Sequence, residues 1–580
     1  MTSTLRILSR PQARDCLFLA LVVIISISFY ISGLGFYGDD WALLASMKLS
    51  PDQSLAGMFA ELTHYHDNEI RPIQFLQIAV LYKIFGLNPL GYHLANGLFL
   101  LTGLVLLYFV MRKLRQPRVL ALSVCTVYAL LPNYSTDRFW ISSSVANVSM
   151  CLFFLGILAH LRALDRRKYG YWGWETFAIL CVIGSGFAYE VFLPLFLLAA
   201  AILFISELHA DTRRSASVRT IGKAALRQAP ILISVAVIGL IKALWAPRVP
   251  ADLEVISYLF WTGRAILKAV LVSYGYHLLL MPATVRYALI HYANPALVAT
   301  AALTGVLVFV RFYTLPDKPA SSAARSRARM FAYVGCGIAL FVAGYSLFPL
   351  DPAENGANNR TAIAGTLGVA VSVVGLLGLL TSFAPEVWRR ALFSATIALI
   401  CVGGVLIIDA VAKFWIASYR LQAKILSEIH EHIKFIPDGS TLILDGVCPY
   451  YGPAPVFRSP WDLSGALSLL YGHADIGANI VTRSATITEK GLAATEERPM
   501  TYPFGQLYVY HYGRKKTYVL PDFAAAQSYF NDTSTDRASR CPADVYGNGV
   551  DVLNGVISRF SRRAATPGAS PVEPVDRDPE

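Results

Sequence analysis

Two adjacent carboxylates, Asp39 and Asp40, follow the first apolar run of the chain in the sequence FYGDDW. Asp is a favoured residue at a helix N-cap, and WALLASMK after the pair is helical in character, so one interpretation is a structural cap by Asp40. The other interpretation is catalytic, with one carboxylate as a general base at the membrane surface and its neighbour orienting a substrate or a cation. Both can hold together, and the residues alone do not decide which acid takes the proton. Two carboxylates could also bind a divalent cation, although nothing in the sequence requires one.

The segment HYHDNEIRP places further polar groups in the same region. His64 and His66 are two residues apart and share a face only in an extended chain, and no second group of ligands is evident, so we predict a supporting role in a solvated loop and no metal site. Arg71 precedes Pro72, at the expected start of a helix. An arginine there can reach a phosphate or clamp an acid.

A third acid, Glu190, lies between apolar runs in GSGFAYEVFLPLF. An ionised group at the centre of a membrane helix costs about 2.5 to 3.5 kcal/mol on insertion scales. We therefore expect Glu190 to face a cavity, a partner or the outer membrane interface. A structural salt bridge is the alternative.

Several basic residues could bind an anionic group. Arg264 and Lys268 are interleaved with aromatic and apolar residues in YLFWTGRAILKAVLVSYGYHLLLMP, and Arg286 follows. This pattern indicates a partly embedded basic surface suited to a lipid that carries phosphate. Arg360, in DPAENGANNRTAIAG, is a second candidate on a later loop.

The composition shows what must position these residues. Of 580 residues, 55% are hydrophobic and 15% are charged, and the mean hydropathy is +0.49, which is typical of a polytopic helical membrane protein. The net charge of +12 falls in clusters between apolar runs, which indicates cytoplasmic anchors rather than a nucleic-acid surface.

Placing these clusters on the cytoplasmic side predicts about eleven transmembrane helices, with residues 1–15 inside the cell and a transmembrane module over residues 16–411. We expect the spans near residues 16–36, 90–111, 119–133, 144–162, 173–190, 191–208, 229–246, 293–312, 330–349, 361–382 and 391–411. The first external loop then covers residues 36–89, and within it residues 71–86 form an amphipathic helix in the membrane interface. All candidate site residues lie at the outer edge of the membrane on this path.

After the last span the sequence alternates and turns on Gly and Pro, as in GQLYVYHYGRKKTYVLPD. This predicts an extracytoplasmic α/β or α+β domain over residues 412–560, followed by a disordered tail at residues 561–580. Cys448 and Cys541 are the two cysteines of this domain, and we predict a disulfide between them.

Three segments together resemble a known family. The acid pair in FYGDDW, the string RPIQFLQIAVLYKIFGLNPLGYHLANGLFLL and the mid-chain GFAYEVFLP resemble the membrane glycosyltransferases of the GT-C fold. Protein O-mannosyltransferases and bacterial transferases that modify lipid A or O-antigen belong to this fold. The resemblance covers residues 16–410, and the second string is its most specific part.

The resemblance implies a polyprenyl-phosphate sugar as donor, an envelope glycan, lipid or protein as acceptor, and inverting transfer without a required cofactor. The family's paired acid falls on Asp39 and Asp40, with Asp39 favoured as the base, and Arg360 matches its habit of binding donor phosphate. Tyr189 stands before Glu190 where related sequences have Lys, so the role of Glu190 differs from theirs or is lost. The implied location is the bacterial inner membrane, with the site on the periplasmic side.

Two other function classes remain open at this stage. A transporter or flippase for lipid-linked sugars would also have many spans, but it would more often show related halves and charges at mid-membrane. A non-catalytic relative could bind a glycan through the C-terminal domain.

Overall fold

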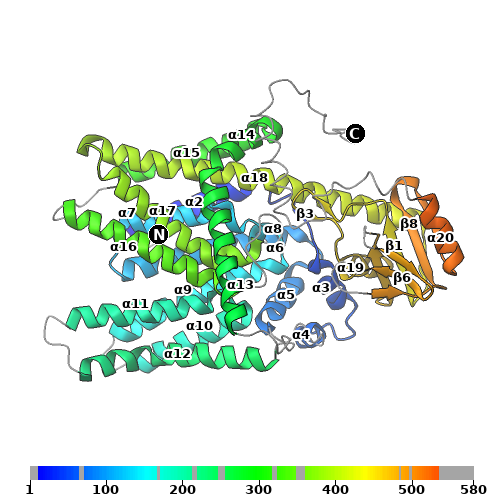
Figure 1. Ribbon diagram of the computed structural model, residues 1–580, viewed down its shortest axis with the longest axis horizontal. Coiled ribbons are helices and arrows are strands. Elements are labelled where there is room, and N and C mark those ends of the chain that lie inside the picture. Colours follow the sequence, from blue (N-terminus) through cyan, green and yellow to red (C-terminus); the bar gives the residue numbers. More distant parts are fainter. Residues whose placement is uncertain are drawn as a thin grey trace, which may run out of the picture.

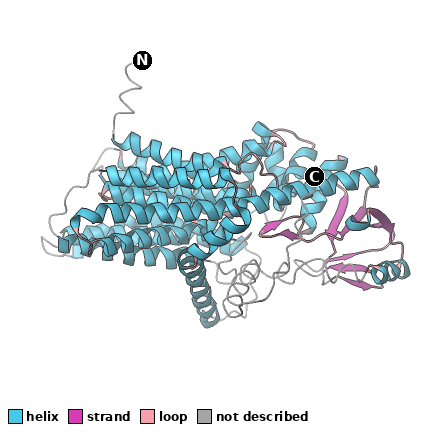
Figure 2. Ribbon diagram, turned by 90° about the horizontal axis from the view of Figure 1, so that it is seen from above, coloured by secondary structure: helices cyan, strands magenta, loops and turns pink. Residues whose placement is uncertain are grey.

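The computed structural model describes residues 11–63, 71–165, 170–211, 218–245, 255–315, 323–347, 359–481, 485–494 and 500–533. Helices form a bundle at one end of the molecule, and strands gather at the other end (Figures 1 and 2). The polytopic helical fold with a C-terminal α/β region is thereby confirmed. His64, His66, Cys541 and the predicted tail at residues 561–580 lie outside the described residues.

Nine helical segments of the described chain are long and apolar enough to cross a membrane. They are built on α2 (Pro11–Ser28), α6 (Pro89–Lys113), α9 (Val145–Asp165), α11 (Leu193–Asp211), α12 (Val218–Trp245), α15 (Pro295–Thr314), α16 (Ala323–Tyr345), α17 (Ala362–Thr381) and α18 (Glu386–His432). The two remaining predicted spans correspond to α7 (Arg118–Leu130) and α10 (Tyr171–Ala188), which pack among them.

The region between α12 and α15 is helical. α13 (Val255–Val270) continues through a π-helical stretch, η6 (Leu271–Leu279), into α14 (Met281–Tyr292), and the pair is bent by 59°. α13 runs across the direction of the bundle helices in Figure 1. This bent pair would form a tenth crossing if it were counted as one span.

α7 is short and lies in the interior of the bundle. Its 13 residues rise about 20 Å, against roughly 30 Å of hydrocarbon, and all but the first two are buried. The chain continues through η2 (Pro132–Tyr134), α8 (Thr136–Phe139) and η3 (Ser142–Ser144), which are also buried. Irregular backbone of this kind is stable only where the protein itself satisfies its polar groups.

The first loop after α2 forms three short helices, α3 (Asp39–Leu49), α4 (Leu55–Thr63) and α5 (Pro72–Phe85). The helix predicted over residues 71–86 is therefore present as α5. Leu76, Val80 and Ile84 form an exposed apolar stripe along it, while Phe75 and Ile78 are buried. A stripe with this spacing suits a helix lying in a membrane interface.

The C-terminal domain is built on a mixed sheet in the order β4-β1-β8-β9. β1 (Ser440–Asp445) pairs in parallel with β4 (Ile476–Ile480) and β8 (Leu507–His511), and β9 (Lys516–Val519) is antiparallel to β8. α19 (Pro460–Tyr471) connects β1 to β4, and α20 (Phe523–Asp532) follows β9. The hairpin β2–β3 (Tyr450–Tyr451, Ala454–Pro455) and a sheet of β5 (Thr486–Thr488), β6 (Gly491–Ala494) and β7 (Met500–Tyr502) complete the described strands.

α18 joins the two parts as one continuous helix of 47 residues, about 70 Å long. It leaves the bundle and runs beside the strands (Figure 1). Ile425 and Ile429 of its last turns are buried in one core with Leu442 and Leu444 of β1. The predicted domain boundary at residue 411 thus falls inside a helix that belongs to both parts.

Candidate active site

Asp40 is buried and its carboxylate is saturated with hydrogen bonds. Its Oδ1 accepts the Ser142 backbone N–H at 2.8 Å and the Ser142 hydroxyl, and its Oδ2 accepts the Tyr37 N–H at 3.0 Å. Burial raises the pKa of Asp40 to about 7, although these hydrogen bonds act in the opposite direction. Asp40 therefore fastens the start of α3 to η3.

Asp39 precedes it and is only partly buried. Its Oδ1 accepts the indole N–H of Trp461, in α19 of the C-terminal domain, at 2.7 Å. The structure shows no hydrogen bond to Oδ2 from the described residues. One oxygen of Asp39 is therefore held by the protein, and the side chain is less enclosed than that of Asp40.

Gly38 fixes where the pair begins. It has φ +51°, a conformation that residues with a side chain rarely adopt, and a Cβ there would lie 2.7 Å from the Trp140 ring. Gly38, directly before the acid pair, therefore packs closely against the buried ring of Trp140.

Two arginines lie over the ring of Trp140, beside the turn that precedes the acid pair. The guanidinium carbon of Arg360 lies 5.3 Å from the Trp140 ring centroid, and that of Arg458 lies at 5.8 Å. Both distances are within the range of cation–π attraction. Arg360 comes from the start of α17 and Arg458 from the C-terminal domain, so the two parts of the molecule contribute positive charge to one ring.

The short helix η7 (Asn359–Thr361) positions Arg360. The Asn359 side chain accepts the Thr136 backbone N–H at 3.0 Å and donates to the Ser135 hydroxyl at 3.2 Å. Asp137, next along this segment, is fully buried, and its carboxylate oxygens accept no hydrogen bond from the described residues. Burial raises the pKa of Asp137 well above its ordinary value, against the charges of Arg360 and Arg138.

Arg71 and Glu190 form an ion pair, which Lys242 of α12 joins. Arg71 Nη2 lies 2.6 Å from Glu190 Oε1, and Lys242 Nζ lies 2.9 Å from Glu190 Oε2. The Arg71 guanidinium also stacks on Tyr189 at 4.5 Å. Burial alone would lower the pKa of Arg71, but Glu190, Tyr189 and, more weakly, Asp39 raise it. Arg71 is thus close enough to the acid pair to act on it electrostatically.

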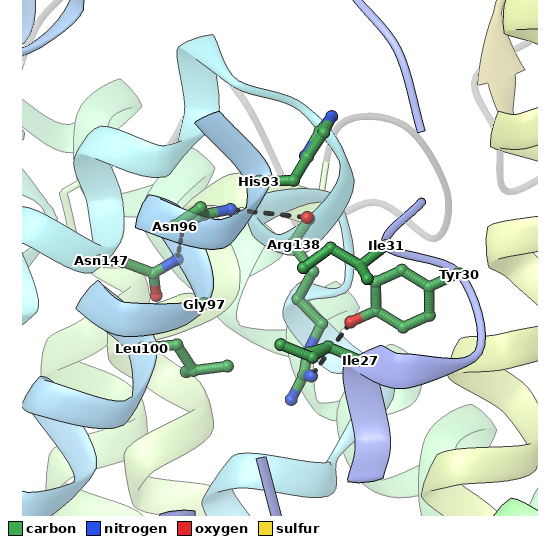
Figure 3. Close-up of a pocket in the computed structure, with 9 residues that line it drawn as sticks. All are labelled: Ile27, Tyr30, Ile31, His93, Asn96, Gly97, Leu100, Arg138 and Asn147. Atoms are coloured by element: carbon green, nitrogen blue, oxygen red, sulfur yellow. Dashed lines mark hydrogen bonds between the residues drawn. The ribbon is translucent and has the colours of Figure 1, made fainter. Parts of the chain in front are cut away.

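The residues of the string NPLGYHLANG support this arrangement from behind. Asn88 caps α6 by accepting the Leu90 N–H, His93 Nε2 lies 3.0 Å from the Gly35 carbonyl, and Asn96 donates to the Asp137 carbonyl at 2.8 Å. Figure 3 shows His93 and Asn96 beside a small cavity that Arg138, Asn147 and Ile27 of α2 also line. These contacts hold the loop before Asp39 and the segment that carries Trp140.

The structure thus brings together four of the predicted features: the acid pair, Arg71, Glu190 and Arg360. Arg71 reaches Asp39 by charge, and Tyr189 is within the electrostatic reach of both Arg71 and Arg360. Arg264, Lys268 and Arg286 lie on α13 and α14, and in the described part of the chain they form no ion pair or hydrogen bond with these residues. Arg264 stacks instead on Trp261 of its own helix.

Cys448 is disulfide-bonded. Its predicted partner Cys541 lies outside the described residues, so the pairing stays a prediction. No group of three His, Cys, Asp or Glu residues suited to a metal ion occurs in the described ranges.

Four residues of the site were missed by sequence reasoning: Trp140, Ser142, Arg458 and Trp461. A signal existed for the first two, because LPNYSTDRFWISSS is polar and aromatic between two apolar runs. Arg458 and Trp461 carried no signal, since only the docking of the C-terminal domain brings them to Asp39.

No family model and no curated protein matches this sequence. Two solved structures have a similar arrangement of the chain. One is ArnT from Cupriavidus metallidurans bound to undecaprenyl phosphate, with 15% identity, a TM-score of 0.34, and coverage of 82% of this chain and 87% of that one. The other is the Archaeoglobus fulgidus oligosaccharyltransferase, with 13% identity, a TM-score of 0.42, and coverage of 82% and 65%.

Both are membrane glycosyltransferases of the GT-C fold, the fold that the sequence resembles. At these identities and TM-scores, the likeness assigns no role to any residue. The roles considered below rest on the geometry of this chain.

Proposed function

We propose that this protein is an integral-membrane inverting glycosyltransferase. It moves a sugar from a polyprenyl-phosphate donor to an envelope glycan, lipid or protein, on the periplasmic side of a bacterial inner membrane. One observation carries this proposal. Asp39, of whose oxygens only Oδ1 accepts a hydrogen bond from the described residues, shares a site with two cations on the Trp140 ring, Arg360 and Arg458.

Asp39 suits the general base better than Asp40. A base must be within hydrogen-bond reach of the proton that it takes. The Asp40 oxygens are occupied by Ser142 and Tyr37 inside the protein, whereas Asp39 is partly exposed with one oxygen open. Asp40 then orients the loop, and Asp39 accepts the hydroxyl proton of the acceptor.

In the transfer step, the acceptor oxygen loses its proton to Asp39 and bonds to the anomeric carbon. The bond between that carbon and the phosphate oxygen breaks, the electron pair leaves with polyprenyl phosphate, and the configuration inverts. The leaving group is already an anion, so no protein acid is needed beside it. Arg360 and Arg458 are placed to stabilise its charge by ionic hydrogen bonds.

Arg264, Lys268 and Arg286 fit a different part of the same donor. α13 exposes Leu259, Phe260 and Leu267, so the helix suits an interface where its cations meet lipid phosphates. We keep these three as contacts for the lipid carrier. No cofactor is needed for this chemistry, and a divalent cation bound by Asp39 remains compatible with it.

The proposal is tested by mass spectrometry of envelope glycans, lipids and proteins from cells with and without the gene. We expect one sugar substituent to disappear, and to return with the wild-type protein but not with Asp39→Asn. Restoration by Asp39→Asn would contradict the assigned chemistry.

The same comparison separates the alternatives. A flippase predicts loss of the substituent together with accumulation of the intact lipid-linked sugar, and it predicts rescue by Asp39→Asn. A non-catalytic relative predicts that every sugar linkage persists without the gene.

A further inference from the structure

The C-terminal domain docks directly on the helix that begins with the acid pair. α19 packs against α3 so closely that a Cβ at Gly465 would lie 2.5 Å from the Ala42 backbone nitrogen. Only glycine permits this approach. The register of α19 against α3 is therefore fixed about one helical turn from Trp461.

The first turn of α19 is held equally firmly. The side chain of Ser459 caps the helix, and Asp462 returns the interaction by accepting the backbone N–H groups of Arg458 and Ser459 at 3.1 and 3.2 Å. This capping box fixes the first turn of the helix, and Trp461 lies in that turn between Ser459 and Asp462.

The connection from β1 to α19 is tied to the bundle helix α18. The Pro455 carbonyl accepts hydrogen bonds from Ser418 and, at 3.2 Å, from Gln422. Gly452 lies against Phe414, where a Cβ would be 2.4 Å from the ring. The segment that leads to Trp461 is thus held against α18 at two points, Gly452 and Pro455.

We propose that Trp461 is a positioning residue for the base. Its indole N–H holds Oδ1 of Asp39 at 2.7 Å and leaves Oδ2 directed to the acceptor, so the C-terminal domain completes the catalytic centre rather than serving only as a separate binding module. This inference rests on the proposed function of Asp39.

The bond has two consequences for catalysis. A hydrogen bond to a carboxylate is stronger than one between neutral groups, so the indole N–H restrains the Asp39 side chain firmly. It also restricts rotation of the carboxylate group. A misplacement of about 1 Å in a reacting group can lower the rate about a hundredfold.

The test compares Trp461→Phe with Trp41→Phe in the purified full-length protein in lipid nanodiscs. Both variants keep an aromatic ring and lose one indole hydrogen bond at the contact between the two parts of the molecule. Trp461 donates to Asp39, whereas Trp41 donates to the neutral amide of Gln422 at 2.8 Å. The donor probe is a panel of synthetic polyprenyl-phosphate glucose, galactose, mannose and arabinose, with the isolated cell-envelope fraction as acceptor.

For Trp461→Phe we expect kcat to fall about ten- to a hundredfold with little change in KM for the donor. The loss is expected in kcat because the misplaced carboxylate slows the chemical step and the indole does not contact the donor. Trp41→Phe should share any loss of thermal stability but keep nearly the wild-type kcat.

A Trp461→Phe variant with the wild-type kcat would overturn the inference while leaving the proposed function intact. Equal falls in kcat in both variants would also overturn it, since the effect would then be general loosening of the interface. If the wild-type protein transfers none of the four sugars and cells without the gene keep every envelope sugar linkage, the proposed function fails, and the inference fails with it.

Discussion

Asp39 and Asp40 are adjacent in sequence, but their carboxylates have different surroundings. Both carboxylate oxygens of Asp40 accept hydrogen bonds, from Ser142 and Tyr37. Asp39 accepts one, from Trp461 of the C-terminal domain, and its other oxygen accepts none from the described residues. Successive residues at a helix start point in different directions, which separates an anchoring acid from a reacting one. This difference favours Asp39 as the base of the proposed mechanism, a choice that the residue types alone leave open.

Gly38 gives the sharpest test of how the pair is positioned. Gly38→Ala would place a methyl group against Trp140 at a backbone φ of +51°, so the turn before Asp39 must move. We expect sugar transfer to fall at least tenfold, measured per folded molecule.

Gly86→Ala is the matched control. Gly86 also has a positive φ, +57°, but a Cβ there meets nothing within 4 Å. We expect a loss of about 1 kcal/mol of stability and nearly normal transfer. Equal activities in the two variants would argue against a positioning role for Gly38.

The raised pKa of Asp462 predicts that the stability of the protein depends on pH. Burial, followed by the charge of Asp39, raises the pKa of Asp462 to about 8. The native protein then holds this proton more tightly than the unfolded chain, whose carboxyl has an ordinary pKa near 4. Stability is therefore lost as pH rises from about 4 to 8.

We expect the melting temperature in detergent to fall between pH 6 and pH 8, and to fall less in Asp462→Asn, which keeps an oxygen for the capping hydrogen bonds. Asp40, with a pKa of about 7, adds to the fall in both proteins. If the melting temperature falls equally with pH in the wild type and in Asp462→Asn, the pKa of Asp462 is not raised.

Among the elements, the ion triad of Arg71, Glu190 and Lys242 joins α5, the turn after α10, and α12. Glu190→Gln leaves two cations facing each other in a partly buried place. We expect a loss of about 2 to 4 kcal/mol in the free energy of unfolding, measured by thermal unfolding in detergent.

The control is Asp165→Asn, which breaks the more exposed pair of Lys113 and Asp165. Its expected cost is below about 1 kcal/mol. If the two changes cost the same, the triad does not hold these elements together.

The elements also show what the sequence could predict. Apolar length located the spans, and Pro72 and Gly86 marked the ends of α5, because these signals are local. The role of residues 131–144 could not be predicted in this way. α7 stops short, and its continuation is stable only because Asn96, Asn147 and Asn359 from three other parts of the chain satisfy its polar groups.

At the scale of the whole molecule, the site is an interface between two parts that composition alone treats as separate. α18 carries the chain from the bundle into the C-terminal domain without a break, and α19 then returns to α3. The sequence predicted both parts but not their contact, since no local pattern encodes the approach of Gly465 to Ala42. Arg458 and Trp461 could only be found with the fold in hand.

The proposed transfer mechanism depends most on Asp39 as the base that activates the acceptor. The most direct test is the rate of sugar transfer by Asp39→Asn in membranes that contain equal amounts of folded protein. Asparagine keeps an oxygen that can accept the Trp461 N–H but cannot take a proton, so we predict a rate roughly 10² to 10⁴ times lower, with binding of polyprenyl phosphate unchanged. A rate within a few-fold of the wild type would contradict the account.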